Sequence, residues 1–403
     1  MKKAPASSDG IIKIVLKSGK DQSLYRLHPW VFSGAIKKVY GEPSDGEVVE
    51  VYDNKDNFLG TGHFQPGSIA VRILSFVPRV INSDFFREKI LAAVDYRKSL
   101  GLAGSKNTNV FRLIHGEGDQ LPGLIADYYN GVVVVQFHSV GMYKERELIT
   151  ELMATIPGIP VKAIYNKSEN TLPFMAGLNP VNGYVYGAGE PEQEPVLENG
   201  YLFGVDWVGG QKTGFFIDQR ENRLLASTFS DGRSVLNLFG YTGGFSVYAM
   251  KNARMVHTVD SSAAATAMAT KNIALNYGND SAHESITADA FQHLDESRGK
   301  YDMMILDPPA FAKHNNVLGN ALQGYKRLNM KAIENINPGG IIFTFSCSQV
   351  VTKDNFRKSV FAAAANTKRN VRIIHQLSQP ADHPVNIYHP ESEYLKGLVL
   401  FVE

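Results

Sequence analysis

The feature that most constrains the fold is a strict alternation of strand-like and helix-like segments in the second half of the chain. Short apolar or β-rich runs predict strands at residues 234–239, 255–260, 284–287, 301–307, 340–345 and 371–377. Helices are expected between them at residues 245–251, 263–277, 318–335 and 353–364. Such alternation is typical of a parallel sheet with helices on both faces, so this part of the chain predicts an α/β domain.

The end of the chain departs from this alternation. Residues 394–402 have the composition of another strand, but no helix separates them from the strand expected at 371–377. A parallel neighbour needs a crossover connection, which is usually helical. We therefore predict a Rossmann-like, mostly parallel sheet whose last strand is antiparallel.

Residues 11–76 have a different pattern. Three β-rich runs, at 11–16, 47–52 and 69–74, are separated by turn-forming pairs such as Asp45-Gly46. Short strands with turn chemistry between them indicate a small β-barrel-like domain.

The region that follows mixes both kinds of element. Asn82 is a good helix cap for a segment that ends near Leu100, and strand-like runs and a helix over about 142–153 come after it. This mixture predicts an α+β domain. A Gly-, Pro- and Glu-rich stretch at 187–199 is expected to be a linker or loop. The predicted domains are residues 1–77, 78–190 and 191–403.

Composition narrows the class of protein. The chain has 403 residues, 44% apolar residues and a single cysteine, which excludes a disulfide framework and favours the cytoplasm. No run approaches the roughly 20 apolar residues that span a bilayer, so no membrane association is expected. The first 40 residues carry eight Lys and Arg against two acidic residues, although the net charge of the whole chain is only +1. This basic region fits a polyanion contact or an ordinary solvated face, and composition does not decide between them.

The single cysteine, Cys347, directly follows the strand expected at 340–345, within Ser346-Cys347-Ser348. Ligands bind at the carboxyl edge of open α/β sheets, and a thiolate there is a candidate nucleophile. The alternative is a small buried apolar residue at the end of a strand. Local sequence alone leaves both open.

A glycine-rich loop follows the first strand of the α/β region. It includes Phe239, Gly240, Tyr241 and Gly243, and Asp260 ends the next strand 20 residues after Gly240. Glycines allow close approach to a ligand, and an acid at this place can bind ribose hydroxyls. The loop is not Gly-x-Gly-x-x-Gly and there is no Walker motif, so S-adenosylmethionine fits better than a dinucleotide or ATP.

Two more acids are expected at the same edge of the sheet. Asp289 could contact the adenine amino group, cap a helix over 290–295, or do both. Asp307 precedes Pro308-Pro309, and these two prolines fix the backbone and aim the carboxylate at one point. Residues 211–222 predict only a hairpin that enters a helix. The histidines have no metal-ligand spacing, so no metal is expected.

Together these motifs resemble the ribosomal RNA large subunit methyltransferase I group, class I S-adenosylmethionine-dependent cytosine-C5 methyltransferases with an N-terminal PUA domain. The resemblance covers nearly the whole chain. It is carried by residues 28–35, 112–123, 212–220, 239–245, 307–311, 344–348 and 381–384.

The resemblance implies roles for these residues. Phe239 to Gly244 would form the cofactor loop, Asp260 would hold the ribose and Asp289 would reach the adenine. Asp307 would lie beside the methyl donor and the target base, and Cys347 would be the nucleophile that adds to C6 of cytosine. The basic N-terminal domain would bind large-subunit ribosomal RNA, and a homodimer is expected.

Two departures and two alternatives accompany this hypothesis. Related cytosine-C5 enzymes have a second cysteine where this chain has Pro309 and Ala310, and members of the group more often have Lys at the position of Ala310. A ribosomal RNA methyltransferase that acts on a guanine nitrogen shares the Lys212-Thr213-Gly214 entry and an Asp-Pro-Pro-x-Phe sequence but needs no cysteine. An RNA-binding factor with a relict cofactor fold is the third hypothesis, which the intact acids disfavour.

Overall fold

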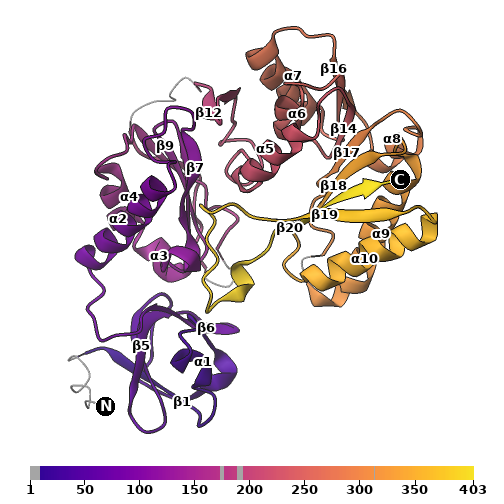
Figure 1. Cartoon of the computed structure of the whole chain (residues 1–403). Coiled ribbons are helices and arrows are strands. Elements are labelled where there is room, and N and C mark those ends of the chain that lie inside the picture. The colour runs from indigo at the N-terminus through magenta and orange to yellow at the C-terminus, as the bar shows by residue number, and fades with distance from the viewer. Residues whose placement is uncertain (1–9, 173–176, 188–193, 313) are drawn as a thin grey trace. The chain divides into compact units, whose positions relative to one another are not determined.

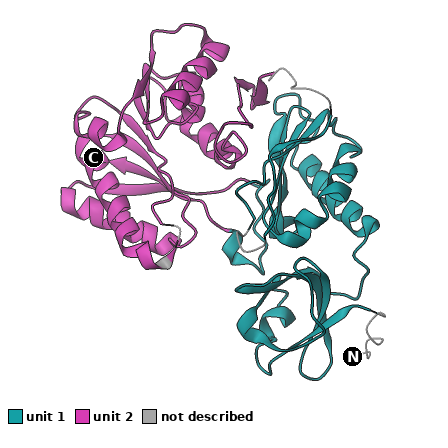
Figure 2. Ribbon diagram, turned by 180° about the vertical axis from the view of Figure 1, so that it is seen from behind, with its two compact units in different colours: residues 1–192, 381–392 teal, residues 193–380, 393–403 magenta. Residues whose placement is uncertain are grey.

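A computed structural model describes residues 10–172, 177–187, 194–312 and 314–403. The chain forms two compact units (Figure 2). Unit 1 comprises residues 1–192 and 381–392, and unit 2 comprises residues 193–380 and 393–403. Residues 381–392 lie between the last two strands of unit 2 in sequence but pack within unit 1.

The first part of unit 1 is the indigo β domain near the N-terminus in Figure 1. It is a six-stranded sheet in the order β2-β6-β5-β4-β1-β3. Its core contains Ile14, Val31, Val49, Val51 and Val71. The three predicted β-rich runs became β1, β4 and β6, which confirms a small β domain. The elements are β1 (Ile12–Leu16), α1 (Gln22–Tyr25), β2 (Trp30–Phe32), β3 (Ile36–Tyr40), β4 (Val48–Tyr52), β5 (Phe58–Phe64) and β6 (Ile69–Ser75).

Strand β5 was not predicted, because two glycines lower its strand propensity. The structure explains Gly62, since a Cβ atom at this position would lie 2.2 Å from the carbonyl oxygen of Arg72 on β6. A glycine is therefore required where these two strands approach most closely.

The second part of unit 1 is a five-stranded sheet in the order β11-β10-β9-β8-β7. Its core packs strands against α2, whose N-cap Asn82 accepts a hydrogen bond from the Phe85 amide, as predicted. The single helix expected at 142–153 was wrong, because Glu145 has non-helical backbone angles and separates α3 from α4. The elements are α2 (Ser83–Ser99), β7 (Val110–His115), β8 (Leu124–Tyr129), β9 (Val132–Phe137), α3 (Val140–Lys144), α4 (Arg146–Ala154), β10 (Ala163–Asn166) and β11 (Gly183–Tyr186).

Unit 2 contains a seven-stranded sheet in the order β16-β15-β14-β17-β18-β20-β19. β20 pairs antiparallel with both neighbours, and the other pairings are parallel. This confirms the predicted α/β fold with an antiparallel last strand. The strands are β14 (Ser234–Leu238), β15 (Met255–Asp260), β16 (His283–Thr287), β17 (Met303–Leu306), β18 (Gly340–Ser346), β19 (Val371–Ser378) and β20 (Lys396–Val402).

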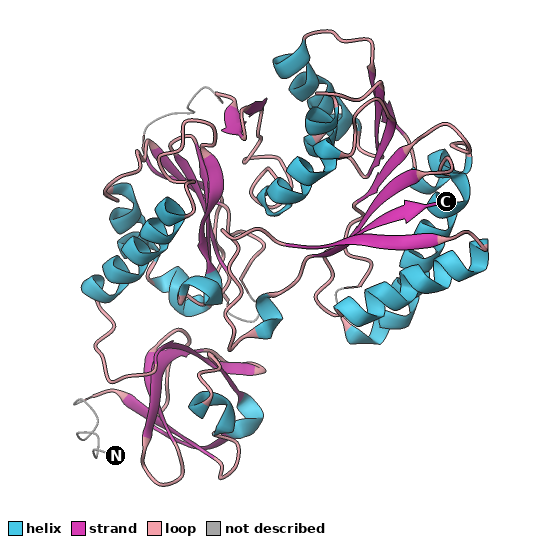
Figure 3. Cartoon of the chain, in the orientation of Figure 1, coloured by secondary structure: helices cyan, strands magenta, loops and turns pink. Residues whose placement is uncertain are grey.

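Helices cover both faces of this sheet (Figure 3). On one face, Leu236 and Leu238 of β14 belong to an apolar core shared with α8, α9 and α10. On the other face, Asn237 Nδ2 donates to Ser246 Oγ of α6. The helices are α5 (Arg220–Thr228), α6 (Gly244–Ala249), α7 (Ala263–Tyr277), α8 (Ala290–Asp295), α9 (Leu318–Asn335) and α10 (Lys353–Thr367).

Two expectations about connecting segments were wrong. Residues 211–222 do not form a hairpin, since turns lead into a short 3-10 helix, Ile217–Gln219, and then α5. The predicted linker at 187–199 includes β12 (Val196–Glu198), which pairs with β13 (Tyr201–Phe203), while residues 188–193 lie outside the described residues. Among the described helices, none is long and apolar enough to cross a membrane.

Candidate active site

The carboxyl ends of four parallel strands gather the predicted site residues at one edge of unit 2. β14 lies between β15 and β17, and β17 is followed by β18. The glycine-rich loop, Asp260, Asp307 and Cys347 each end or directly follow one of these strands. Parallel pairing therefore places at one edge residues that are separated by more than 100 positions in sequence.

The loop after β14 has a tightly constrained backbone. Phe239, Tyr241 and Gly243 all have positive φ, at 58°, 45° and 79°. A Cβ atom on Gly240 would lie 2.4 Å from Cγ2 of Thr258 on β15. The loop therefore turns close against the neighbouring strand, and position 240 has no space for a side chain.

Asp260 holds this loop in place. Its Oδ2 accepts a hydrogen bond from the Tyr241 amide at 2.9 Å, and its Oδ1 accepts one from the Ser262 amide at 2.9 Å. Each carboxylate oxygen retains acceptor capacity for a ligand. Ser262 in turn caps α7 by accepting from the Ala265 amide.

Asp289 follows β16, the outermost parallel strand. Its side chain accepts a hydrogen bond from the Gln292 amide at 2.9 Å, so the predicted capping of α8 is confirmed. The residue is exposed, which leaves carboxylate surface available to a ligand. The adenine contact stays a prediction.

A second loop packs on the glycine-rich loop through Tyr241. The Tyr241 hydroxyl accepts from the Gln211 amide at 3.0 Å and donates to the Gly214 carbonyl at 3.4 Å. The Phe216 ring meets the Tyr241 ring edge-on at 5.2 Å. The 211–216 segment therefore forms one wall of the site, which sequence patterns alone did not reveal.

The Asp307 carboxyl group is half-buried and has one anionic and two cationic neighbours. Burial raises the pKa of Asp307 to about 7, and the charge of Asp218 acts in the same direction. A hydrogen bond from Gln219 Nε2 to Asp307 Oδ2, at 3.0 Å, and the cations of Arg223 and Lys212 oppose this increase. At neutral pH Asp307 can therefore both give and take a proton.

Cys347 follows β18, the strand next to Asp307. Its Sγ lies 4.0 Å from the carbonyl oxygen of Pro308, so the structure brings the cysteine to the Asp-Pro-Pro turn. Burial raises the pKa of Cys347 to about 11, the charge of Asp307 adds to this, and the Lys212 cation lowers it. Cys347 is therefore a neutral thiol at pH 7, and a nucleophilic role requires a base that removes its proton.

A buried lysine fixes the turn that carries Cys347. The ammonium group of Lys396 donates to the carbonyl oxygens of Ser348 and Val351. Lys396 is 5% exposed, and burial lowers its pKa to about 8. Each of its two bonds satisfies a carbonyl group in the turn.

Sequence reasoning missed the polar residues around Asp307. Asp218 and Gln219 are buried, and the Tyr394 hydroxyl donates to Asp218 Oδ2 at 2.7 Å. The other oxygen, Asp218 Oδ1, is buried without a hydrogen-bond partner. The sequence signals were the polar run 218–220, which also fits an ordinary start of a helix, and its place in the segment 212–220 that carries the family resemblance.

One group of side chains in unit 1 has the spacing of a metal site. Ligand atoms of His28, His389 and Glu391 lie within 4.8 Å of one another, and the described residues contain no other such group. However, the Trp30 amide donates to His28 Nδ1 at 3.2 Å, so a neutral His28 carries its proton on Nε2. That nitrogen, 3.5 Å from Glu391, cannot then ligate a metal. The absence of a metal stays a prediction.

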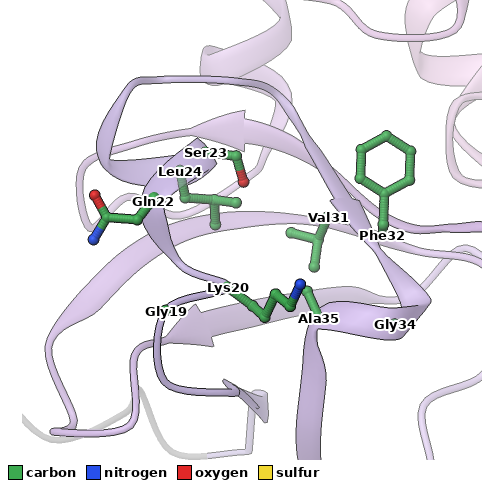
Figure 4. A pocket seen from close by; sticks show the side chains of 9 residues that line it. All are labelled: Gly19, Lys20, Gln22, Ser23, Leu24, Val31, Phe32, Gly34 and Ala35. Atoms are coloured by element: carbon green, nitrogen blue, oxygen red, sulfur yellow. The ribbon is translucent and has the colours of Figure 1, made fainter.

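The basic β domain contains a surface cavity of about 440 Å³ (Figure 4). It is lined by polar and apolar side chains, including Lys20, Gln22, Ser23 and Phe32. Phe32 is 46% exposed, and Lys20 is exposed as well. Exposed aromatic rings and cations that line one groove are typical of surfaces that bind single-stranded nucleic acid.

Two protein families match the chain. A PUA-like domain matches residues 14–76, and an S-adenosylmethionine-dependent methyltransferase domain matches residues 111–396. The fold and the site therefore define a methyltransferase of this class, and its cofactor is S-adenosylmethionine. The tight loop at Gly240 and the acid at the end of β15 fit that cofactor.

Curated relatives narrow the family. The protein named Ribosomal RNA large subunit methyltransferase I from Shewanella denitrificans is 42% identical over 402 residues, which cover 96% of this chain and 98% of the relative. The protein of the same name from Serratia proteamaculans is 40% identical over 397 residues, with coverages of 96% and 98%. The chain belongs to the ribosomal RNA large subunit methyltransferase I family.

Solved structures agree with this assignment. A proposed methyltransferase from Streptococcus mutans has a TM-score of 0.83 and 26% identity, and covers 97% of this chain and 100% of its own. SMU.776, a proposed methyltransferase crystallised with SAH, has a TM-score of 0.84 and 27% identity with the same coverages.

Proposed function

We propose that this protein methylates C5 of a cytosine in large-subunit ribosomal RNA through a covalent bond between Cys347 and the base. The observation that carries the proposal is the meeting of Cys347 with the Asp307-Pro308 turn, with Sγ 4.0 Å from the Pro308 carbonyl oxygen. The names of the relatives support large-subunit ribosomal RNA as the substrate.

The chemistry requires a nucleophile because C5 of cytosine is weakly nucleophilic. Addition of the Cys347 sulfur to C6 breaks the C5–C6 double bond and makes C5 enamine-like. S-adenosylmethionine supplies a methyl group on its sulfonium, which is the electrophile for C5. Loss of the C5 proton to a base then restores the double bond and expels the Cys347 thiolate, and the proton on N3 returns through Asp307 to the sulfur.

Asp307 provides the proton transfer that this sequence needs. In the first step the Cys347 thiol proton passes to Asp307 and then to N3 of the base as the S–C6 bond forms. The pKa of Asp307, which burial raises to about 7, is suited to both transfers. Since the chain has no second cysteine, the same sulfur must attack and leave.

The remaining site residues are proposed to bind the cofactor. Phe239, Gly240, Tyr241 and Gly243 would contact it through the loop backbone, and Asp260 would bind the ribose hydroxyls through its unused acceptor capacity. Asp289 would reach the adenine amino group from the end of β16. Asp307 would also lie beside the methyl group.

Residues 1–77 are proposed to bind the RNA, and residues 78–190 to extend that surface. The aromatic and cationic side chains of the cavity in Figure 4 support this role. The target base must leave its stack or lie in single-stranded RNA to reach Cys347. A homodimer in the cytoplasm stays part of the proposal, with residues 191–403 as the methyltransferase domain.

Replacing the nucleophile tests this proposal. Cys347→Ala should abolish methyl transfer to ribosomal RNA, measured by mass mapping of nucleosides, and should leave the Kd for S-adenosylmethionine within about twofold. RNA that contains 5-azacytidine should form a denaturation-stable adduct with the wild-type protein and none with the variant. Undiminished turnover by Cys347→Ala, or methyl groups on a guanine nitrogen, would refute the covalent mechanism.

A further inference from the structure

A row of side-chain amides connects Asp307 to the end of β19. Gln219 Nε2 donates to Asp307 Oδ2 at 3.0 Å, and Asn222 Nδ2 donates to Gln219 Oε1 at 2.7 Å. Asn222 Nδ2 also donates to the carbonyl oxygen of Ser378 at 3.3 Å. Gln219 and Asn222 are 3% and 4% exposed, so water competes little for these bonds.

The direction of donors and acceptors in this row is fixed at its far end. A backbone carbonyl only accepts, so Asn222 must turn its NH2 group toward Ser378. The second hydrogen of that NH2 group points to Gln219, which must therefore present Oε1 to Asn222 and Nε2 to Asp307. If the Gln219 amide were reversed, its NH2 group would face the NH2 group of Asn222, and its oxygen would face Oδ2 of Asp307. Neither pair could form a hydrogen bond.

We propose that Gln219 and Asn222 are positioning residues that keep Oδ2 of Asp307 as a hydrogen-bond acceptor and thereby place its transferable proton on Oδ1. The inference rests on the proposed function, in which Asp307 delivers a proton to N3 of cytosine. As the S–C6 bond forms, the electron pair of the base moves to N3, and the proton on Oδ1 neutralises it. A proton on Oδ2 would compete with the Gln219 amide.

The position of this proton matters because Asp307 changes its protonation state near the pH at which the protein works. The carboxyl group titrates near neutral pH, because burial raises its pKa to about 7. Gln219 and Asn222 are neutral, so they direct the proton without adding charge. The titratable groups that interact with Asp307 are Asp218, Lys212, Arg223, Cys347 and Tyr325.

Asn222→Asp tests the inference because it reverses the donor and acceptor directions of these hydrogen bonds with almost no change in side-chain shape. The introduced carboxylate only accepts when it is ionised, so Gln219 should rotate and present Oε1 to Asp307, whose proton is then bound to Gln219. We expect the single-turnover rate with RNA at pH 8 to fall about 100-fold, which is the usual scale of one general-acid contribution. The ratio of the variant rate to the wild-type rate should rise toward one at acidic pH, where the introduced carboxyl group is protonated and donates again.

The matched control is Asn335→Asp, since Asn335 also donates to a backbone carbonyl, that of Leu294, outside the site. It should change the rate less than threefold at every pH. Gln219→Glu provides a second variant if Asn222→Asp unfolds, as judged by thermal melting. It should be inactive at pH 8 and recover as the pH falls, because the new carboxyl group donates to Asp307 only when it is protonated.

Adduct formation separates the two proposals. A wild-type adduct with 5-azacytidine RNA, together with unchanged pH–rate profiles in both variants, would overturn the inference and leave the proposed function intact. An absent wild-type adduct would overturn the proposed function, and the inference with it. Low rates that do not recover at acidic pH in a folded variant would show a merely structural role for the amides.

Discussion

At the scale of single residues, Asp307 combines a functional position with an unfavourable environment. The carboxyl group is half-buried, near the negative charge of Asp218 and the Cys347 thiol. An ionised carboxylate in such a place destabilises the folded chain. Active-site groups commonly have perturbed pKa values for this reason.

This environment predicts a pH-dependent gain in stability for Asp307→Asn. The pKa of Asp307 is about 7 in the folded protein, against about 3.9 in an unfolded chain. Between these values the folded state binds more protons, so the stability of the wild type falls as the pH rises from about 4 to 7. Asn cannot titrate, so between pH 4 and pH 8 we expect the unfolding free energy of the variant to rise by about 4 kcal/mol relative to that of the wild type.

Denaturant unfolding across this pH range measures the effect. Asp302→Asn is a control of opposite sign: burial favours a higher pKa for Asp302, but hydrogen bonds from the Ser234 amide and Asn337 lower it overall. Removing the Asp302 carboxylate should therefore destabilise the protein at pH values above the pKa that Asp302 has in the unfolded chain. If both variants change stability in the same direction with pH, the proposed environment of Asp307 is incorrect.

At the scale of elements, β20 links the sheet to the turn that follows Cys347. Ser346 at the end of β18 pairs with Lys396 at the start of β20. The Lys396 ammonium group donates hydrogen bonds to the carbonyl oxygens of Ser348 and Val351, the first and last residues of the turn. An antiparallel strand at this position therefore supplies a cation that a helical crossover would not bring here.

Lys396→Met should slow methyl transfer without weakening cofactor binding. The two carbonyls lose their donor, so the turn becomes less ordered and Cys347 is less often in a reactive position. We expect the single-turnover rate to fall at least tenfold while the Kd for S-adenosylmethionine changes less than twofold. Lys353→Met is the control, because Lys353 forms an exposed ion pair with Glu393. Equal rates in the two variants would exclude this role.

Elements with strong local signals could be predicted from sequence. α2 begins after Asn82, as expected from capping chemistry, and α7 spans the predicted residues 263–277. The division between α3 and α4 lies at Glu145, inside the charged run 144–147 that interrupts the apolar pattern. A single helix over 142–153 was predicted because such a run is also common on the exposed face of one helix.

At the scale of the whole molecule, residues 381–392 belong to unit 1 although their flanking strands belong to unit 2. Within unit 1 the Arg112 amide donates to Asp382 Oδ2, and Arg97 donates to the Asp382 carbonyl oxygen. The His389 ring packs against the Trp30 ring with centroids 4.3 Å apart. These contacts join residues separated by more than 250 positions in sequence.

A charge-removing substitution in the PUA-like domain should weaken RNA binding but not methyl-donor binding. Lys20 is exposed at the cavity in Figure 4, where a phosphate group would be neutralised. Lys20→Gln should reduce RNA affinity and lower the salt slope of binding by about 0.7, as for one phosphate contact on a single strand. Filter binding between 50 and 200 mM salt, roughly the range over which such slopes are measured, provides the readout.

Lys300→Gln is the matched control, since Lys300 is exposed in unit 2. It should leave both affinity and slope unchanged. A Lys20→Gln protein with an unaltered slope would place the RNA elsewhere on the molecule.

The sequence by itself determined what depends on neighbouring residues. Strand and helix alternation, the cap at Asn82, and the strand-end positions of Asp260, Asp307 and Cys347 are local patterns, and short-range physics governs them. The tertiary structure alone decided which side chains meet. Gln219, Asn222 and Ser378 form one row beside Asp307 because the fold brings α5 to the end of β19, and Lys396 reaches the Cys347 turn because β20 pairs with β18. Such contacts depend on chain topology, which local sequence does not encode.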